Sequence, residues 1–314
     1  MNKYVKIGAA CAAVGAAVTL GILASGTKDT EEVVPVSVTE AETQTIITTE
    51  ADPMPENWEY FLEYSPAVAG MTDRAKQLLR KNPDMIGWLK IDKTQVDYPV
   101  LLDPGALEDG LPFYQEGCEY GNSYYIKRDL DRSFKESGTL FMDYRDEFGS
   151  SEADQSENIV IYGHNMLNGS MFGDLRKYRN DNSFFEKSPF IELSSNYKDY
   201  DYVIFAFFRT DGGPNAEFKY WNMQELDTED EYNYYVDTCY KLSQYNTGVD
   251  VKYGDKLLTL QTCGDRYDTE RFLIVARRLR DGEVAGDMST IARTEEYIKA
   301  HQPEPTEESS EAQQ

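Results

Sequence analysis

The stretch Lys256–Leu279, KLLTLQTCGDRYDTERFLIVARRL, decides the fold. Its apolar runs at Lys256–Thr262 and Phe272–Leu279 predict two strands, and the polar segment between them predicts a hairpin turn. Cys263 follows the first strand directly, and Arg271 opens the second. Because a hairpin brings the end of one strand beside the start of the next, we expect the thiol and the guanidinium at one edge of a sheet.

Short strand patterns continue through the chain before this hairpin. They are expected at Ile86–Ile91, Val96–Leu101, Tyr124–Ile126, Gly138–Met142, Asn158–Tyr162, Phe190–Leu193 and Tyr202–Phe208. Helical patterns are expected at Asn57–Asn82, which has Thr72 or Asp73 as a candidate N-cap and ends before Pro83, and at Met171–Tyr178 and Asp227–Gln244. Many short strands with few helices predict a mainly β fold, a barrel or sandwich with peripheral helices.

Acidic residues dominate the charge of the chain. The formal net charge is −25 and the sequence pI is near 4.4. Nucleic acid is therefore not an expected partner, because phosphate binding needs clustered Lys and Arg. We expect residues 27–56 to be an acidic Thr- and Glu-rich linker, and residues 282–314 to be an acidic disordered tail with one short helix at Ser289–Ala300. The folded domain is then predicted to span residues 57–281.

The N-terminus carries an uncharged apolar run, Ile7–Ala24, which follows Lys3 and Lys6. A membrane-spanning helix needs about 20 apolar residues, and basic residues before it favour an N-terminus inside the cell. We therefore expect residues 1–26 to be a single-pass anchor in the cell membrane, with the domain outside the cytoplasm. Small residues at Ala24–Gly26 leave open a cleaved signal peptide, and Cys11 a lipoprotein, although the run before Cys11 is short.

Histidine is scarce, which narrows the choice of an acid–base group. Of the two in the chain, His301 lies in the acidic C-terminal stretch, and His164 follows the strand at Asn158–Tyr162 and a glycine. Cys263 also stands where a strand opens into a loop. An imidazole near a thiol accepts its proton and stabilises the thiolate. The alternative interpretation is a structural histidine and a cysteine buried under a loop.

Arginine supplies the third candidate group. Arg271 precedes the last strand on the side of Cys263, where a guanidinium can donate hydrogen bonds to a developing oxyanion. Three neighbours compete with it on chemistry alone. Arg266 lies at the tip of the loop, and Arg277 and Arg278 lie further along the strand, away from the cysteine. Their positions favour Arg271.

Three ordered motifs make the chain resemble a known family. TLQTC at 259–263 is similar to the TLxTC signature of sortases, and RFLIVAR at 271–277 is similar to the strand that carries their arginine. IYGHNM at 161–166 resembles the YGHNM segment of class B sortases. IGWL at 86–89, DYPV at 97–100, SGTLFMD at 137–143 and GSMF at 169–172 agree with that class. The similarity covers about Asp73 to Leu279.

The resemblance implies an eight-stranded sortase β-barrel with an N-terminal helical region and a long helix before the cysteine strand. It also implies a cysteine transpeptidase that needs no metal or cofactor. By analogy, the Cys263 thiolate attacks the Thr carbonyl of a C-terminal sorting signal on a surface protein and forms a thioacyl enzyme. His164 acts as general acid and base, and Arg271 stabilises the oxyanion. The acceptor amine belongs to a peptidoglycan cross-bridge or, in some members, to a pilin lysine.

The residues that read the substrate are harder to identify. The class B resemblance implies a signal of the NP-x-T type. Tyr220, Trp221 and Asn222 lie between a predicted strand and the long helix, and together with Thr262 they are our candidates for substrate contact. Gln261 stands where class B members often carry Ser. Because it points to the face opposite Thr262, we expect this difference to affect catalysis little.

Two other functions remain open at this point. A secreted cysteine protease would hydrolyse the thioacyl intermediate, but the papain-like signature is absent and the histidine precedes the cysteine. A non-catalytic surface binding module would bury Cys263 and use His164 structurally. Cys118 and Cys239 are expected to be small buried hydrophobes, with a disulfide between them left open.

Overall fold

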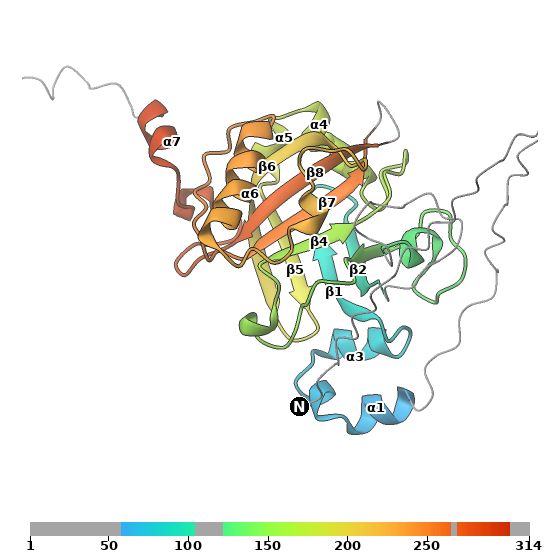
Figure 1. The fold of residues 1–314 in the computed structure, drawn as a ribbon. Helices are drawn as coiled ribbons and strands as arrows, with labels where there is room; N and C mark the ends of the chain where they lie inside the picture. The colour runs from blue at the N-terminus through green and yellow to red at the C-terminus, as the bar shows by residue number, and fades with distance from the viewer. Residues whose placement is uncertain (1–57, 104–121, 265–268, 302–314) are drawn as a thin grey trace, which may run out of the picture. The chain divides into compact units, whose positions relative to one another are not determined.

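The computed structural model of the chain describes residues 58–103, 122–264 and 269–301. Within these residues, eight strands form a closed barrel in the order β1-β2-β3-β4-β7-β8-β6-β5 (Figure 1). The strands are β1 Met85–Lys90, β2 Asp97–Leu102, β3 Leu140–Met142, β4 Asn158–Tyr162, β5 Phe190–Ser195, β6 Asp199–Asp211, β7 Leu257–Cys263 and β8 Glu270–Arg278. The predicted eight-stranded barrel is confirmed, and the strand at Asn158–Tyr162 has the predicted bounds.

Two of the strand pairs are parallel, and one of them determines where the active site can form. β2 pairs with β3 and β4 pairs with β7 in parallel, whereas the other neighbours are antiparallel. A parallel pair requires a long crossover connection, and here β5, β6 and the helices between β4 and β7 supply it. The parallel pairing places the C-terminal ends of β4 and β7 at the same edge of the barrel.

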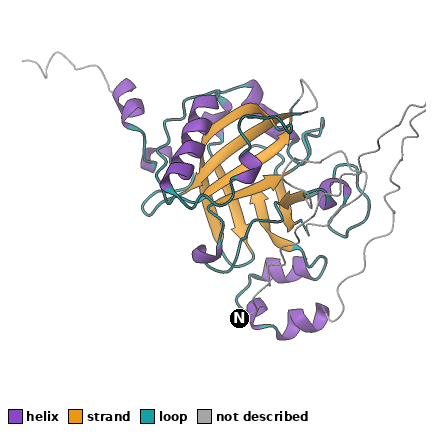
Figure 2. Cartoon of the chain, viewed as in Figure 1, coloured by secondary structure: helices purple, strands orange, loops and turns teal. Residues whose placement is uncertain are grey.

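Helices cover the barrel at several places (Figure 2). They are α1 Trp58–Tyr64, α2 Pro66–Ala69, α3 Asp73–Leu79, α4 Arg176–Asn180, α5 Phe184–Lys187, α6 Glu229–Leu242 and α7 Glu295–Ala300, together with the 3₁₀ turns η1 Tyr124–Lys127, η2 Glu152–Asp154, η3 Gly173–Leu175, η4 Tyr220–Asn222 and η5 Met288–Thr290. The predicted helix at 57–82 is divided into three short helices. Thr72 caps the third, because its Oγ1 accepts the Ala75 N–H at 3.2 Å.

The long helix α6 lies where it was predicted. A capping box fixes its start, since the Thr228 side chain accepts the Glu231 N–H and the Glu231 side chain accepts the Thr228 N–H. Its buried face carries Tyr232, Tyr235, Val236 and Cys239. Cys239 is a free thiol, fully buried, as expected for a small hydrophobe; Cys118 lies outside the described residues.

One predicted strand is wrong. Tyr124–Ile126 begins the 3₁₀ turn η1, and its three side chains are buried together rather than on alternate faces. Polar contacts hold this turn: the Tyr124 N–H donates to Asp103 at 3.0 Å, and the Tyr125 hydroxyl donates to Asp84 at 2.5 Å. A short aromatic run is compatible with a strand or a helical turn, so periodicity alone cannot separate the two.

The segment after β8 also differs from the prediction. Residues 282–301 belong to the described part of the chain and include η5 and α7 in place of one continuous helix, although neither element has a buried residue. Glu283 pairs with the fully buried Arg277 at 2.6 Å, and Ile291 is 5% exposed. The Ala292 N–H donates to Glu283 at 2.9 Å. The acidic composition was misleading because the partner of Glu283 lies within the barrel.

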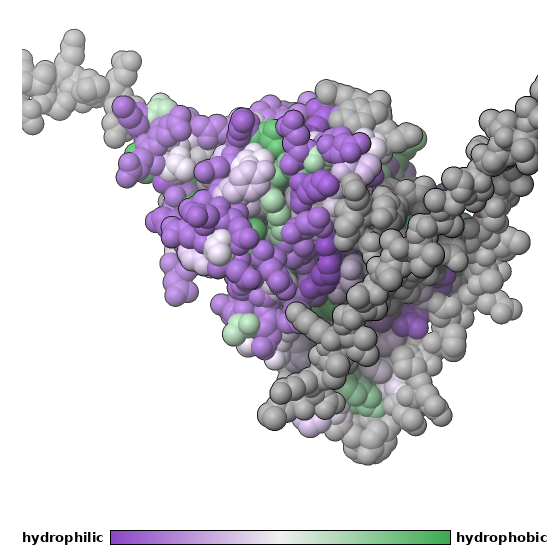
Figure 3. Space-filling model, viewed as in Figure 1, coloured by the Kyte–Doolittle hydropathy of each residue, from purple (hydrophilic) through white to green (hydrophobic). Residues whose placement is uncertain are grey.

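The described surface in Figure 3 is largely hydrophilic, in keeping with the acidic composition. None of the helices within the described ranges is long and apolar enough to cross a bilayer. The predicted anchor at Ile7–Ala24 and the linker at 27–56 lie outside those ranges.

Candidate active site

The β7–β8 hairpin brings Cys263 and Arg271 together as predicted. The two residues are direct register partners at the end of the antiparallel pair, and the Gly264 N–H donates to the Glu270 carbonyl at 2.7 Å just beyond them. Side chains of directly paired residues project from the same face of a sheet. The thiol and the guanidinium therefore share one face.

The parallel pairing of β4 with β7 places His164 on the side of Cys263 opposite to Arg271. Tyr162 pairs with Gln261, and the Gly163 N–H donates to the Gln261 carbonyl at 3.1 Å. His164 lies two residues beyond Tyr162, and Cys263 lies two residues beyond Gln261, so the same register aligns them. Neighbouring strands are about 4.8 Å apart. The order across the three strands is thus His164, Cys263, Arg271, with β4, β7 and β8 side by side (Figure 1).

Side-chain hydrogen bonds lock the histidine loop to the cysteine strand. The Asn165 amide Nδ2 donates to the Cys263 carbonyl at 3.0 Å, the position that a backbone N–H would take if the ladder continued. The Thr262 hydroxyl donates to the Gly163 carbonyl at 2.8 Å. Asn165 was not among our predicted site residues, although its place directly after His164 marks it as a neighbour of the site.

The environment of Cys263 favours a protonated thiol in the unliganded protein. The residue is half-buried, and burial raises its pKa because a thiolate is poorly solvated there. The positive charge of Arg271 acts in the opposite direction and lowers the pKa. The thiol therefore needs both its cation and a base to become a nucleophile.

His164 is placed to be that base. Burial lowers its pKa, against a hydrogen bond to the backbone of Ile126 and the charge of Glu136, which raise it. The imidazole is thus neutral near neutral pH and can accept a proton. Its Nε2 is buried and makes no hydrogen bond to a residue in the described ranges. Ile126 belongs to η1, so the turn that we mispredicted as a strand supports the histidine.

The other arginines of the strand have structural contacts. Arg277 is fully buried and paired with Glu283, and Arg278 lies 3.9 Å over the Tyr200 ring. Arg266 lies outside the described residues. Arg271 is 6% exposed and donates to the Glu270 carbonyl at 2.9 Å. The position of Arg271 beside Cys263 favours it as the cation of the site.

The candidates for substrate contact have different exposures. Thr262, Tyr220 and Trp221 are buried, whereas Asn222 is exposed and accepts a hydrogen bond from Arg145 at 3.1 Å. The two aromatic side chains therefore belong to the interior beside the site, and Asn222 is the member whose side chain reaches the surface.

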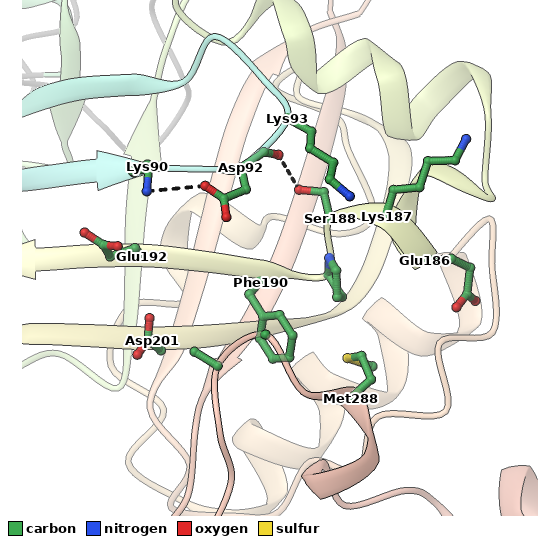
Figure 4. A pocket seen from close by; sticks show the side chains of 13 residues that line it. Lys90, Asp92, Lys93, Glu186, Lys187, Ser188, Phe190, Glu192, Asp201 and Met288 are labelled. Atoms are coloured by element: carbon green, nitrogen blue, oxygen red, sulfur yellow. Dashed lines mark hydrogen bonds and ion pairs between the residues drawn. The ribbon is translucent and has the colours of Figure 1, made fainter.

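A separate cavity of about 600 Å³ lies between β1, β5 and the segment before η5 (Figure 4). Lys90, Asp92, Glu192, Phe190 and Met288 are among the residues that line it, and none of the three candidate catalytic residues does. Over the described ranges, no group of three or more His, Cys, Asp or Glu side chains could hold a metal ion. The reactive groups on which we build the site are therefore the thiol, the imidazole and the guanidinium.

Comparison with known families agrees with this geometry. The sequence model of the Sortase domain matches residues 89–279, which is more than half of the chain. The chain belongs to the sortase family. Sortases are cysteine transpeptidases, so the predicted class of enzyme is confirmed.

The relatives of this sortase are of class B. The sortase B of Listeria monocytogenes is 32% identical over 199 residues, which cover 63% of this chain and 70% of that protein. The sortase B of Staphylococcus aureus is 28% identical over 207 residues, which cover 65% and 74%. The structure of the Staphylococcus aureus sortase B–substrate complex is similar with a TM-score of 0.56 and 26% identity, over 72% of this chain and 95% of that one.

Proposed function

We propose that Cys263, His164 and Arg271 carry out the transpeptidation in this sortase. The observation that supports this assignment is the register of three adjacent strands, which aligns the imidazole, the thiol and the guanidinium in one row. Asn165 and Thr262 fix that row by bonding β7 to the loop after β4. In this order a nucleophile has a base on one side and an oxyanion donor on the other.

The first half of the reaction forms a thioester. The Cys263 thiol gives its proton to His164, and the thiolate Sγ attacks the carbonyl carbon of the scissile peptide bond. Arg271 donates hydrogen bonds to the oxyanion of the tetrahedral intermediate. When the C–N bond breaks, the leaving amine takes the proton from the His164 imidazolium.

The second half transfers the acyl group to an amine. The incoming amine attacks the thioester carbonyl and gives a proton to His164, and the C–S bond breaks to restore the thiolate. Arg271 again stabilises the oxyanion. The charges that develop are all met by groups of this chain, so the proposed mechanism uses no cofactor.

The proposed donor is a surface protein with a C-terminal sorting signal of the NP-x-T type, as the similarity to class B sortases suggests. The proposed acceptor is an amine of a peptidoglycan precursor or a pilin lysine. Asn222, exposed at the end of η4, is the candidate that can contact the donor directly, while Thr262, Tyr220 and Trp221 shape the wall behind it. We also propose that Ile7–Ala24 anchors the enzyme in the cell membrane with the barrel outside the cytoplasm.

The test uses the purified chain and a quenched fluorescent sorting-signal peptide, with and without an amine acceptor. Amine-dependent ligation product is the expected result. Hydrolysis that no amine diverts would indicate a cysteine protease, and no thiol-dependent turnover would indicate a binding module. Cys263→Ala is expected to abolish turnover and leave the circular dichroism spectrum and Tm unchanged. Retained activity in that variant would overturn the assignment.

A further inference from the structure

Gln261 makes a contact that the family comparison does not predict. Its Oε1 accepts a hydrogen bond from the Tyr220 hydroxyl at 2.7 Å, and the two residues are 4% and 0% exposed. Gln261 lies two positions before Cys263 and therefore projects from the same face of β7 as the thiol. The Gln261–Tyr220 pair thus lies in the row directly behind the row of His164, Cys263 and Arg271.

Gly212 shows how close this pair comes to the guanidinium stem. A Cβ placed on Gly212 would lie 2.6 Å from Arg271 Cγ and 3.3 Å from the Tyr220 hydroxyl oxygen. Both groups therefore pack against the same point of the backbone. The Gly212 N–H donates to the Thr269 carbonyl at 2.7 Å, which holds that point against the start of β8. The Arg271 side chain and the Tyr220 hydroxyl therefore both lie close to one point above Gly212.

The turn that carries Tyr220 is itself held firmly. The Trp221 carbonyl accepts hydrogen bonds from Arg145 Nη2 and Gln224 Nε2, each at 2.5 Å. Arg145 is fixed in turn by Asp143, which it meets through two hydrogen bonds of 2.8 and 2.7 Å. Asp143 is fully buried. The backbone next to Tyr220 is therefore a rigid support rather than a mobile loop edge.

We propose that Gln261 and Tyr220 are positioning residues that hold Arg271 against the Cys263 side of the sheet. The proposal rests on the roles assigned above to Cys263 and Arg271. It also revises our expectation that Gln261 has little effect: a serine at this position would end two atoms earlier along the side chain, whereas glutamine reaches the Tyr220 hydroxyl.

The test compares Tyr220→Phe, Gln261→Met and the double variant. Each single change removes one member of a buried hydrogen bond at nearly constant volume. We expect kcat to fall about tenfold with little change in KM, because the lost support acts on the transition state. The double variant should lose no more than the worse single variant, because the two residues act as one unit.

A second readout follows the thiol itself. Arg271 lowers the pKa of Cys263, so a displaced guanidinium should move the midpoint of Cys263 alkylation by iodoacetamide to higher pH. Gly212→Ala should reproduce the same pair of effects by a different route, since its methyl group pushes directly on Arg271 Cγ. If Gly212→Ala changes kcat and the alkylation midpoint in the same way as the Tyr220 and Gln261 variants, displacement of the Arg271 guanidinium is the common cause.

Tyr235→Phe is the matched control. The Tyr235 side chain is fully buried, and its hydroxyl lies 2.6 Å from Thr259 Oγ1. Thr259 belongs to β7, as Gln261 does, but it lies four residues before Cys263. We expect Tyr235→Phe to change neither kcat nor the alkylation midpoint. The proposal fails if Tyr220→Phe behaves like this control, if the losses of the single variants add, or if stability falls while the midpoint stays fixed. Turnover by Cys263→Ala would instead reject the proposed function.

Discussion

An arginine is buried near each end of β8, and the two arginines have different partners for their charge. Arg277 is fully buried near the C-terminal end of β8, here called the closed end, and is neutralised by Glu283 through two hydrogen bonds of 2.6 and 2.7 Å. Arg271, near the N-terminal end, here called the open end, is 6% exposed and lies opposite the Cys263 thiol, whose pKa it lowers. We therefore propose that the same residue type on one strand supports stability at one end and electrostatic catalysis at the other. Five predictions test this contrast.

The largest effect is expected at the open end. Arg271→Ala should lower kcat by about 10²–10³, as loss of one oxyanion donor does elsewhere, while Tm changes little. Steady-state kinetics with the sorting-signal peptide would measure the loss. Arg271→Lys should recover only part of it, because an ammonium lacks the planar fork of donors. A variant that keeps full activity would exclude Arg271 from the chemistry.

At the closed end the expected change is in stability. Arg277→Met should destabilise the fold by about 3 kcal/mol, because it leaves the Glu283 carboxylate buried without its cation. Activity per folded molecule should stay close to that of the parent chain. Urea unfolding would measure the change, and the double variant Arg277→Met with Glu283→Leu should recover most of the loss. A stable single variant would contradict the structural role.

The Arg277–Glu283 pair also predicts how the stability of the fold changes as the pH falls. Burial alone would raise the pKa of Glu283, but hydrogen bonds from Arg277 and from the Ala292 and Arg280 N–H groups lower it to about 2. Because the folded pKa lies below that of the unfolded chain, the pair contributes stability above pH about 4.3, which is lost as the pH falls toward 2. Unfolding curves of the parent chain and of Arg277→Met should therefore converge over that interval.

A smaller loss is expected from the glycine after the nucleophile. A Cβ on Gly264 would clash with the Glu270 side chain, which is 2% exposed, so Gly264→Ala must displace that side chain or the hairpin beside Cys263. We expect kcat/KM to fall about tenfold. Gly70→Ala is the control, since its new methyl group would meet only the Tyr197 ring, at 3.7 Å. Equal behaviour of the two variants would show that the hairpin tolerates the clash.

The smallest effect is expected in the pH dependence of kcat/KM, which depends on the groups at the open end. In the proposed mechanism the reactive form pairs a Cys263 thiolate with a His164 imidazolium, although burial raises the pKa of the first and lowers that of the second. kcat/KM should therefore rise through an acid limb below the ordinary histidine pKa and fall through an alkaline limb above the ordinary cysteine pKa. Arg271→Gln should move the alkaline limb to higher pH, whereas Arg277→Met should leave both limbs in place.

The sequence was informative wherever local pattern decides structure. The β7–β8 hairpin follows from two apolar runs around a polar turn, and this pattern predicts the pairing of Cys263 with Arg271 that the structure has. The scarcity of histidine left His164 as the partner, and the parallel register of β4 and β7 agrees with that choice. These inferences need only strand periodicity and chain order.

Local pattern failed where the deciding partner is distant in the sequence. The turn at Tyr124–Lys127 depends on Asp84 and Asp103, which no window around it contains. Residues 282–301 were expected to be disordered because they are acidic, yet Glu283 is tied to a buried arginine. The Gln261–Tyr220 bond spans 41 residues and could not be inferred from the motif around Cys263.

The parallel pairing of β4 and β7 also has a consequence for how the enzyme folds. The Asn165–Cys263 bond joins residues 98 positions apart, and the chain between them includes β5, β6, most of β7 and the helix α6. Contacts of such high sequence separation carry a large closure entropy and form late. Arg271 reaches Cys263 when the β7–β8 hairpin forms, whereas His164, the proposed base, reaches it only when that hairpin docks against β4. Until then the cysteine lacks its proposed base, so we expect the chain to gain full reactivity only when the barrel closes, and a partly folded chain to lack an activated nucleophile.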